Sequence, residues 1–401
     1  MPEAARPDDA RFRQWLLALI GGQIGLHATM AGVRLAAPLQ ALREGHSAWT
    51  VGVLLALYAA APVLLSMPAG RMADRHGYRR PVRIAVALAL AGALLALAST
   101  WTGPSARLPL LGVSAVCVGS GANLGLIVIQ RTAGQVARTS TERMRMFSWL
   151  GVAPSLSNVI GPVAAGFMID AGGFSAAYAS MLLLPLCTLW FARRVPARMQ
   201  VAAPAPSVGR RSAWSLLRTP GLPRLLGVNW VLAACWDVHL FAVPILGFER
   251  GFGAGTIGLI LGSFTLAVSG VRLLIPLWAH RIREIALLRV AMVGTGLVFA
   301  VYPLAQSPWV MGLCAVLLGL TLGAVQPMIM STLHQLTPEG RHGEAIAMRS
   351  MVMNASSTAL PLVFGAAGTA LGAATLFWAV GFAVVAGSWA ARRLPGGDSA
   401  A

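Results

Sequence analysis

Twelve long apolar runs follow one another along the 401-residue chain, and short polar stretches separate them. A helix needs about 20 apolar residues to cross the hydrocarbon core of a bilayer, and each run is close to that length. Unpaired backbone groups are too costly in lipid, so such runs are expected to form helices. The pattern predicts an all-α membrane protein with 12 transmembrane helices at residues 14–38, 49–69, 82–101, 108–130, 147–169, 174–192, 222–247, 254–278, 286–305, 309–333, 345–369 and 371–391.

The composition supports this prediction. Hydrophobic residues make up 57% of the chain and charged residues only 11%, whereas a soluble domain has about 25% charged residues. Too little polar sequence is present to cover so much apolar surface, and this excludes a soluble protein with buried helices.

Basic charge is distributed unevenly between the loops. The formal net charge of +18 comes from arginine, because the chain contains no lysine. If successive segments alternate in direction, the loops on one side contain only Arg43, Arg107 and Arg250. Cytoplasmic loops are enriched in basic residues. The asymmetry therefore predicts a multi-pass protein of a bacterial inner membrane with both termini in the cytoplasm, and it argues against nucleic acid as a partner.

Motifs of enzymes and metal sites are missing from the sequence. It contains no H-E-x-x-H, no P-loop and no G-x-S-x-G, and its four cysteines lie in apolar segments without metal-like spacing. We therefore expect that the protein is neither an enzyme nor an ATP-driven pump. We also expect that it has no catalytic residues and binds no metal or cofactor.

The longest polar stretch, residues 192–221, separates six segments from six. It predicts an N-terminal six-helix bundle at residues 1–191, a cytoplasmic linker at 192–221 and a C-terminal six-helix bundle at 222–401. The two halves align with each other at offsets of 206 and 199 residues, which indicates two pseudo-symmetric bundles. The aligned pairs include Pro38 with Pro244, Gly45 with Gly251, Gly52 with Gly258, Pro162 with Pro361, Gly166 with Gly365 and Gly173 with Gly372. Parallel repeats of this kind bracket a site near the membrane midplane in many transporters.

The stretch GRMADRHGYRR, between the second and third predicted segments, resembles the signature loop of the major facilitator superfamily. The resemblance implies a conformational gate formed by Gly70, Asp74, Arg75, Gly77, Arg79 and Arg80. It also implies that Asp74 contacts the start of the eleventh helix, near Gly343, and holds the cytoplasmic side shut. The alternative for the arginines is that they only set the topology.

A second stretch, SNVIGPVAAG in the fifth segment, is similar to an element of the 12-helix drug/proton antiporter branch. Gly161, Pro162 and Gly166 match that element and predict a bent helix with a small-residue packing face. The arginine that this branch has in the fourth helix is replaced by Ala115. The replacement puts ordinary exchange of cationic drugs for protons in doubt.

The family fold implies that the first, fourth, seventh and tenth helices line a central cavity. Each of them has polar residues at helical spacing. The candidate cavity residues are Gln23, His27, Arg34, Asn123, Gln130, Asn229, Trp230, Asp237, Gln326, Met330 and His334. The alternative for the amides is that they join neighbouring helices.

Three of these residues are candidates for proton or charge coupling. Asp237 is the acid predicted deepest in the membrane, where charges are costly and usually functional. The repeat places it about one turn from Arg34, so the two could pair across the halves, either during transport or as a static structural pair. His27 is a candidate for proton exchange.

The sequence therefore predicts a secondary active transporter that works by alternating access and is coupled to protons. We expect it to export a small organic solute as an antiporter. The candidate cavity residues include one acid, Asp237, but two basic residues, Arg34 and His27, and several amides. This balance favours an anionic or zwitterionic solute. The alternatives are a proton-coupled importer of an organic anion or metal chelate and a transport-inactive membrane sensor. The expected partners are the solute, protons and the lipid bilayer, and we expect a monomer.

Overall fold

The computed structural model describes residues 7–136, 149–195, 213–278, 284–338 and 341–392, and every regular element in these ranges is a helix. The chain forms two compact units. Unit 1 contains Met1–Ala41, Leu57–Ala205 and Gly253–Gly262, and unit 2 contains Leu42–Ala56, Pro206–Phe252 and Ser263–Ala401. The predicted linker lies mostly outside the described residues, and the predicted domain boundaries stay a prediction.

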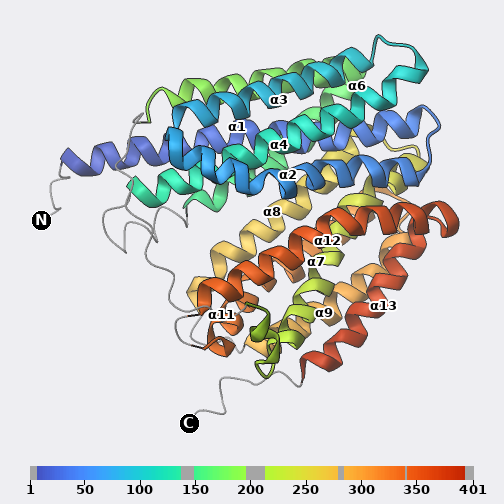
Figure 1. The fold of residues 1–401 in the computed structure, drawn as a ribbon. Coiled ribbons are helices and arrows are strands. Elements are labelled where there is room, and N and C mark those ends of the chain that lie inside the picture. The colour runs from blue at the N-terminus through green and yellow to red at the C-terminus, as the bar shows by residue number, and fades with distance from the viewer. Residues whose placement is uncertain (1–6, 137–148, 196–212, 279–283, 339–340, 393–401) are drawn as a thin grey trace, which may run out of the picture. The chain divides into compact units, whose positions relative to one another are not determined.

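Figure 1 shows the helices, coloured by their place in the sequence. Their assignment to the two units is as follows. Unit 1 holds most of α1 (Pro7–Arg43), α3 (Arg79–Ser99), α4 (Pro104–Val136) and α6 (Val152–Ala192). Unit 2 holds η1 (Ala213–Arg218), α7 (Leu222–Glu249), α9 (Glu284–Val301), η3 (Tyr302–Leu304), α10 (Pro308–Gly323), α11 (Val325–Leu336), α12 (His342–Leu371) and α13 (Ala373–Ala391). Each unit also takes part of α2 (Ala48–His76) and part of α8 (Ala254–Trp278).

The described residues contain 10 spans that are long and apolar enough to cross a membrane. One of them, Val152–Ala192, comprises two helices, because its backbone is non-helical at Gly172 and Gly173. A further predicted segment corresponds to α2, whose apolar part Ala48–Ala60 is shorter. With α6 divided and α2 added, the helices account for the twelve predicted segments, and the all-α membrane fold is confirmed.

Four glycines that the internal repeat aligns have a positive φ angle. Gly45 (φ 83°) follows α1 and Gly251 (φ 71°) follows α7. Gly173 (φ 73°) divides α6, and Gly372 (φ 85°) separates α12 from α13. Glycine adopts this conformation without the steric cost that other residues incur. The two halves of the chain therefore turn at matched positions.

In unit 1, the start of α8 crosses α6 at very short range. A Cβ atom at Gly258 would collide with the carbonyl oxygen of Pro162, and one at Gly166 would collide with that of Ala254. The carboxylate of Asp170 accepts hydrogen bonds from the backbone N–H groups of Ala254 (2.9 Å) and Gly255 (2.7 Å). Asp170 thus satisfies two of the free donors at the N-terminus of α8.

In unit 2, the start of α2 crosses α12 at a similarly short distance between the two backbones. A Cβ atom at Gly52 would collide with the carbonyl oxygen of Pro361, and the backbone N–H of Trp49 donates to Oγ1 of Thr369 over 2.9 Å. The two offsets relate every residue of this crossing to its counterpart in unit 1. The duplication that the sequence predicts is therefore present in the packing of each unit.

Candidate functional site

A cavity of about 130 Å³ lies among the helices of unit 2. Its walls come from α7, α8, α10, α11 and α12. The polar, aromatic and sulfur-containing side chains that line it are Asn229, Trp236, Arg272, Gln326, Arg349 and Met353. The described lining residues thus include two arginines and two amides but no acid.

The hydrogen bonds around this cavity leave guanidinium donors unused. Nη2 of Arg272 donates to Oε1 of Gln326 over 3.0 Å, and Nδ2 of Asn229 donates to Sδ of Met353 over 2.6 Å. The Nε atoms of Arg272 and Arg349 are buried and have no hydrogen-bond partner among the described residues. A buried donor without a partner costs about 1–3 kcal/mol. The wall is therefore suited to an anionic group that accepts these bonds.

The structure brings two predicted cavity residues, Asn229 and Gln326, to this cavity. Trp230 is 42% exposed and does not line it, whereas Trp236 does. The sequence prediction did not include Arg272 or Arg349. A signal for Arg272 was present, because it is a charged residue within an otherwise apolar segment.

Two further predicted residues, Met330 and His334, line a separate pocket of about 30 Å³ at the end of α11. Leu333, Thr337 and Ile346 complete its lining. A space of this size holds about one water molecule. This pocket is too small to receive an organic solute.

The candidate residues of unit 1 lie on α1 and α4. Gln23 is buried, and its Oε1 has no hydrogen-bond partner among the described residues. His27 and Arg34 are half-buried and close enough to interact electrostatically. Arg34 also interacts with Tyr58 of α2, whose buried hydroxyl has no described hydrogen-bond partner. His27, Arg34 and Tyr58 thus form a small group of interacting polar side chains within unit 1.

The other two candidates of unit 1 differ in exposure. Asn123 is half-buried and Gln130 is exposed, both on α4. Their place in a substrate cavity stays a prediction.

Asp237 lies on α7 and is half-buried beside Cys235, with which it interacts electrostatically. It belongs to unit 2, whereas Arg34 belongs to unit 1. The predicted ion pair between them stays a prediction, and so do the coupling roles of Asp237, Arg34 and His27.

The signature stretch is mostly helical. The helix α2 continues to His76, so Gly70, Asp74 and Arg75 belong to its last turns. The sequence had predicted a loop at these residues, and that prediction is wrong. The turn itself comprises Gly77, with a φ of 66°, and Tyr78. The side chains of Asp74 and the residues near Gly343 lie outside the described part of the structure. The proposed gate contact and the roles of Arg79 and Arg80 stay predictions.

The packing element of the fifth segment lies in α6. A Cβ atom at Gly161 would collide with the carbonyl oxygen of Ala28 on α1. Pro162 and Gly166 form the crossing with α8 described above. Each small residue of this element thus allows a neighbouring backbone to approach closely.

Comparison with known proteins identifies the family. The family model described as "Major Facilitator Superfamily" matches residues 19–308 and 225–399. The enterobactin exporter EntS of Salmonella typhi is 27% identical over 324 residues, which cover 77% of this chain and 74% of that protein. The tetracycline resistance protein, class B, of Escherichia coli is 33% identical over 138 residues, or 33% of this chain and 31% of that protein.

Solved structures share the fold at low sequence identity. The inward-open xylose transporter XylE from E. coli aligns with a TM-score of 0.74 and 14% identity over 97% of this chain and 98% of that one. A POT family transporter in complex with 5-aminolevulinic acid aligns with a TM-score of 0.72 and 16% identity over 93% and 94% of the two chains.

Proposed function

The chain belongs to the major facilitator superfamily, and from this premise we propose that it is a proton-coupled exporter of a small organic solute with an anionic group. It would work by alternating access between two six-helix bundles in a bacterial inner membrane, with both termini in the cytoplasm. Its partners would be the solute, protons and lipid, and it would act as a monomer.

The observation that supports this solute class is the pair of arginines in the cavity of unit 2. Arg272 and Arg349 each present a buried Nε–H group without a described partner, and no acid is among the described lining residues. A carboxylate or phosphate accepts such donors at short range and in a fixed geometry. The same anion would offset two positive charges in a setting where water is scarce.

The amides of the same wall favour a solute with further polar groups. Gln326 already accepts a hydrogen bond from Arg272, and this bond fixes the orientation of the guanidinium. Asn229 lies on α7 and lines the same cavity, and its carbonyl oxygen can accept a hydrogen bond from an amine or hydroxyl. A cavity of about 130 Å³ accommodates the charged group and its near neighbours, so a larger solute would extend beyond unit 2.

The direction of transport rests on the relatives. Five of the matched relatives are named as enterobactin exporters, and a shorter match is to a tetracycline resistance protein. The first name refers to export of a solute from the cell, and resistance to a drug is compatible with export. Coupling to protons would use Asp237, Arg34 and His27, the three candidates for coupling that the sequence predicts.

Flux into liposomes tests the proposal. Purified protein is reconstituted, a pH gradient of either sign is imposed, and movement of radiolabelled citrate and of enterobactin is followed. An antiporter accumulates its solute in the more acidic compartment, because protons leave that compartment in exchange. Accumulation on the alkaline side beyond that in protein-free vesicles would indicate proton-coupled import. Binding of a probe without any flux would indicate a sensor, and either result would overturn the proposal.

A further inference from the structure

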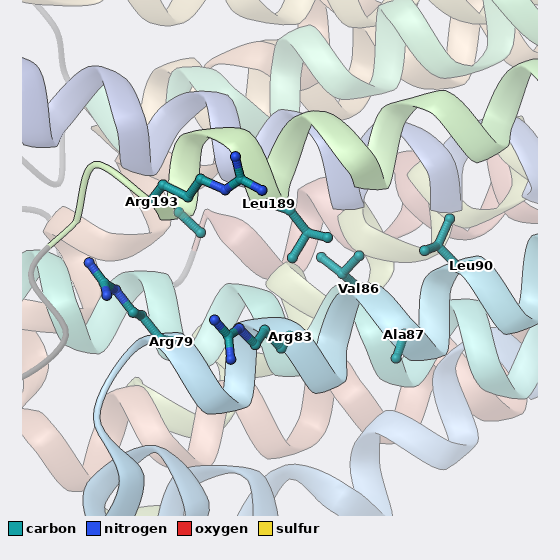
Figure 2. A pocket seen from close by; sticks show the side chains of 8 residues that line it. Arg79, Arg83, Val86, Ala87, Leu90, Leu189 and Arg193 are labelled. Carbon is teal, nitrogen blue, oxygen red and sulfur yellow. The ribbon is translucent and has the colours of Figure 1, made fainter.

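A groove with a volume of about 390 Å³ lies between α3 and α6 of unit 1. The two helices run side by side (Figure 1). Figure 2 shows the groove with basic side chains gathered at one end and apolar side chains along the rest. Of the residues that line the groove, only Arg79 belongs to the signature stretch, and the proposed transport function does not explain the others.

The basic end is formed by three arginines from two helices. Arg79 and Arg83 lie on the first turns of α3, and Arg193 follows the last residue of α6. All three are exposed, and the structure gives none of them a hydrogen bond or ion pair with another described residue. Three positive charges therefore converge on one place without a described acid to offset them.

The apolar part continues along the same helices. Val86, Ala87 and Leu90 follow Arg83 at intervals of three or four residues, so they share one face of α3. Leu189 lies on α6, one turn before Arg193. The groove is thus polar at one end and hydrocarbon-like over the next two turns.

The position of this groove relative to the membrane follows from the spans. Arg79 is the first residue of the span Arg79–Ser99, and Arg193 directly follows the span Val152–Ala192. The arginines therefore lie at one membrane–water interface, with the apolar residues at the depth of the acyl chains. Near this interface Trp190 is 52% exposed, as is typical of residues at the headgroup level.

Arg194, the residue after Arg193, makes a contact outside the groove. The guanidinium of Arg194 lies 3.5 Å from the ring centre of Trp190, in a cation–π contact. It does not line the groove, and neither does Arg80. Arg80 and Arg194 thus supply two charges beside the groove that are not part of it.

We propose that this groove binds one anionic phospholipid. Its phosphate would accept hydrogen bonds from Arg79, Arg83 and Arg193, and one acyl chain would lie along Val86, Leu90 and Leu189. Basic pockets between membrane helices on the cytoplasmic side are suited to anionic headgroups, because that leaflet carries negative charge. A soluble phosphate would meet the same arginines but would leave the apolar part of the groove without a ligand.

The test uses the full chain purified in detergent and its thermal unfolding midpoint. We expect dioleoylphosphatidylglycerol to raise the midpoint, and dioleoylphosphatidylcholine and inorganic phosphate to have little effect. In the variant with Arg83→Gln and Arg193→Gln, the response to phosphatidylglycerol should be lost. The control variant, with Arg80→Gln and Arg194→Gln, has the same net charge and should retain the response.

Two results would overturn the proposal. One is an equal response of both double variants to phosphatidylglycerol, which would show that the groove does not matter. The other is an effect of inorganic phosphate as large as that of the lipid, which would show a site for free anions. A photoactivatable phosphatidylglycerol gives a second readout on the unmodified chain. It should label α3 and the end of α6, and labelling confined to other helices would contradict the proposal even if the variants fail to fold.

Discussion

Tyr78 lies in the turn between α2 and α3, inside the signature stretch, and its surroundings are apolar. Its ring is 2% exposed and belongs to the apolar core of unit 1, together with Leu19, Val82 and Ile129. The hydroxyl has no hydrogen-bond partner among the described residues. Burial raises the pKa of this hydroxyl above its usual value. Tyr78 therefore acts as a large hydrophobic residue that anchors the turn between α2 and α3.

Replacing Tyr78 by Phe tests this role. Tyr78→Phe removes a buried hydroxyl without a partner and keeps the ring, so the free energy of unfolding should stay equal or rise by about 1 kcal/mol. The raised pKa of Tyr78 also determines how the stability of the wild type changes at high pH. The unfolded state ionises near pH 10, before the folded state does, so the wild type loses stability as the pH rises above about 10.

The Phe variant lacks that contribution and should lose less stability over the same pH range. Thermal unfolding midpoints at pH 7 and above pH 10 measure both effects. A clear drop in the midpoint of Tyr78→Phe at pH 7 would show that the hydroxyl has a partner and would contradict this role.

At the same scale, the sequence predicted only part of the candidate site. Asn229 and Gln326 were found because amides recurred at helical spacing on the expected helices. Arg272 lies on α8, which the family fold does not place around the cavity, and Arg349 lies near the start of α12, where an arginine also suits a membrane interface. Which of these side chains face one space depends on the packing of five helices, and one sequence does not specify it.

At the scale of elements, the paired glycines show what the sequence could predict. Gly52 and Gly258 were matched by the repeat, and each lies where two helices cross with almost no space between their backbones. Helix boundaries were harder to predict. The polar end of α2 was expected to be a loop, but arginine is a good helix former and the helix continues until Gly77 turns the chain.

The crossing of α8 with α6 predicts opposite effects of two similar substitutions. Gly258→Ala would place a methyl group against the carbonyl oxygen of Pro162, and such overpacking costs about 1–3 kcal/mol. Gly270→Ala, on the same helix, meets no atom within 4 Å and should be neutral or stabilising by up to about 1 kcal/mol.

The unfolding midpoints of the two variants, measured side by side in detergent, check this difference. If Gly258→Ala unfolds at the same temperature as Gly270→Ala, the close approach of α8 to α6 is not a determinant of stability.

At the scale of the whole molecule, the apolar pattern and the internal repeat determine the fold class. Twelve segments, matched turns and matched crossings in the two units agree with the family match over most of the chain. Function is less well determined at this scale, because relatives of similar fold have names that refer to peptides, nucleosides, sugars and iron. The solute must be inferred from the side chains of the cavity and not from the fold.

The most direct measurement is the KM for solute flux in liposomes that contain Arg272→Gln or Arg349→Gln. Losing a charged hydrogen-bonding partner costs about 1.5–3 kcal/mol, so the KM for an anionic solute should rise by about 10- to 150-fold. Arg289→Gln is the matched control, because Arg289 on α9 also has a buried Nε without a described partner but does not line the cavity. It should leave the KM unchanged. An unchanged KM in both cavity variants, with flux intact, would contradict the assignment of an anionic solute to this cavity.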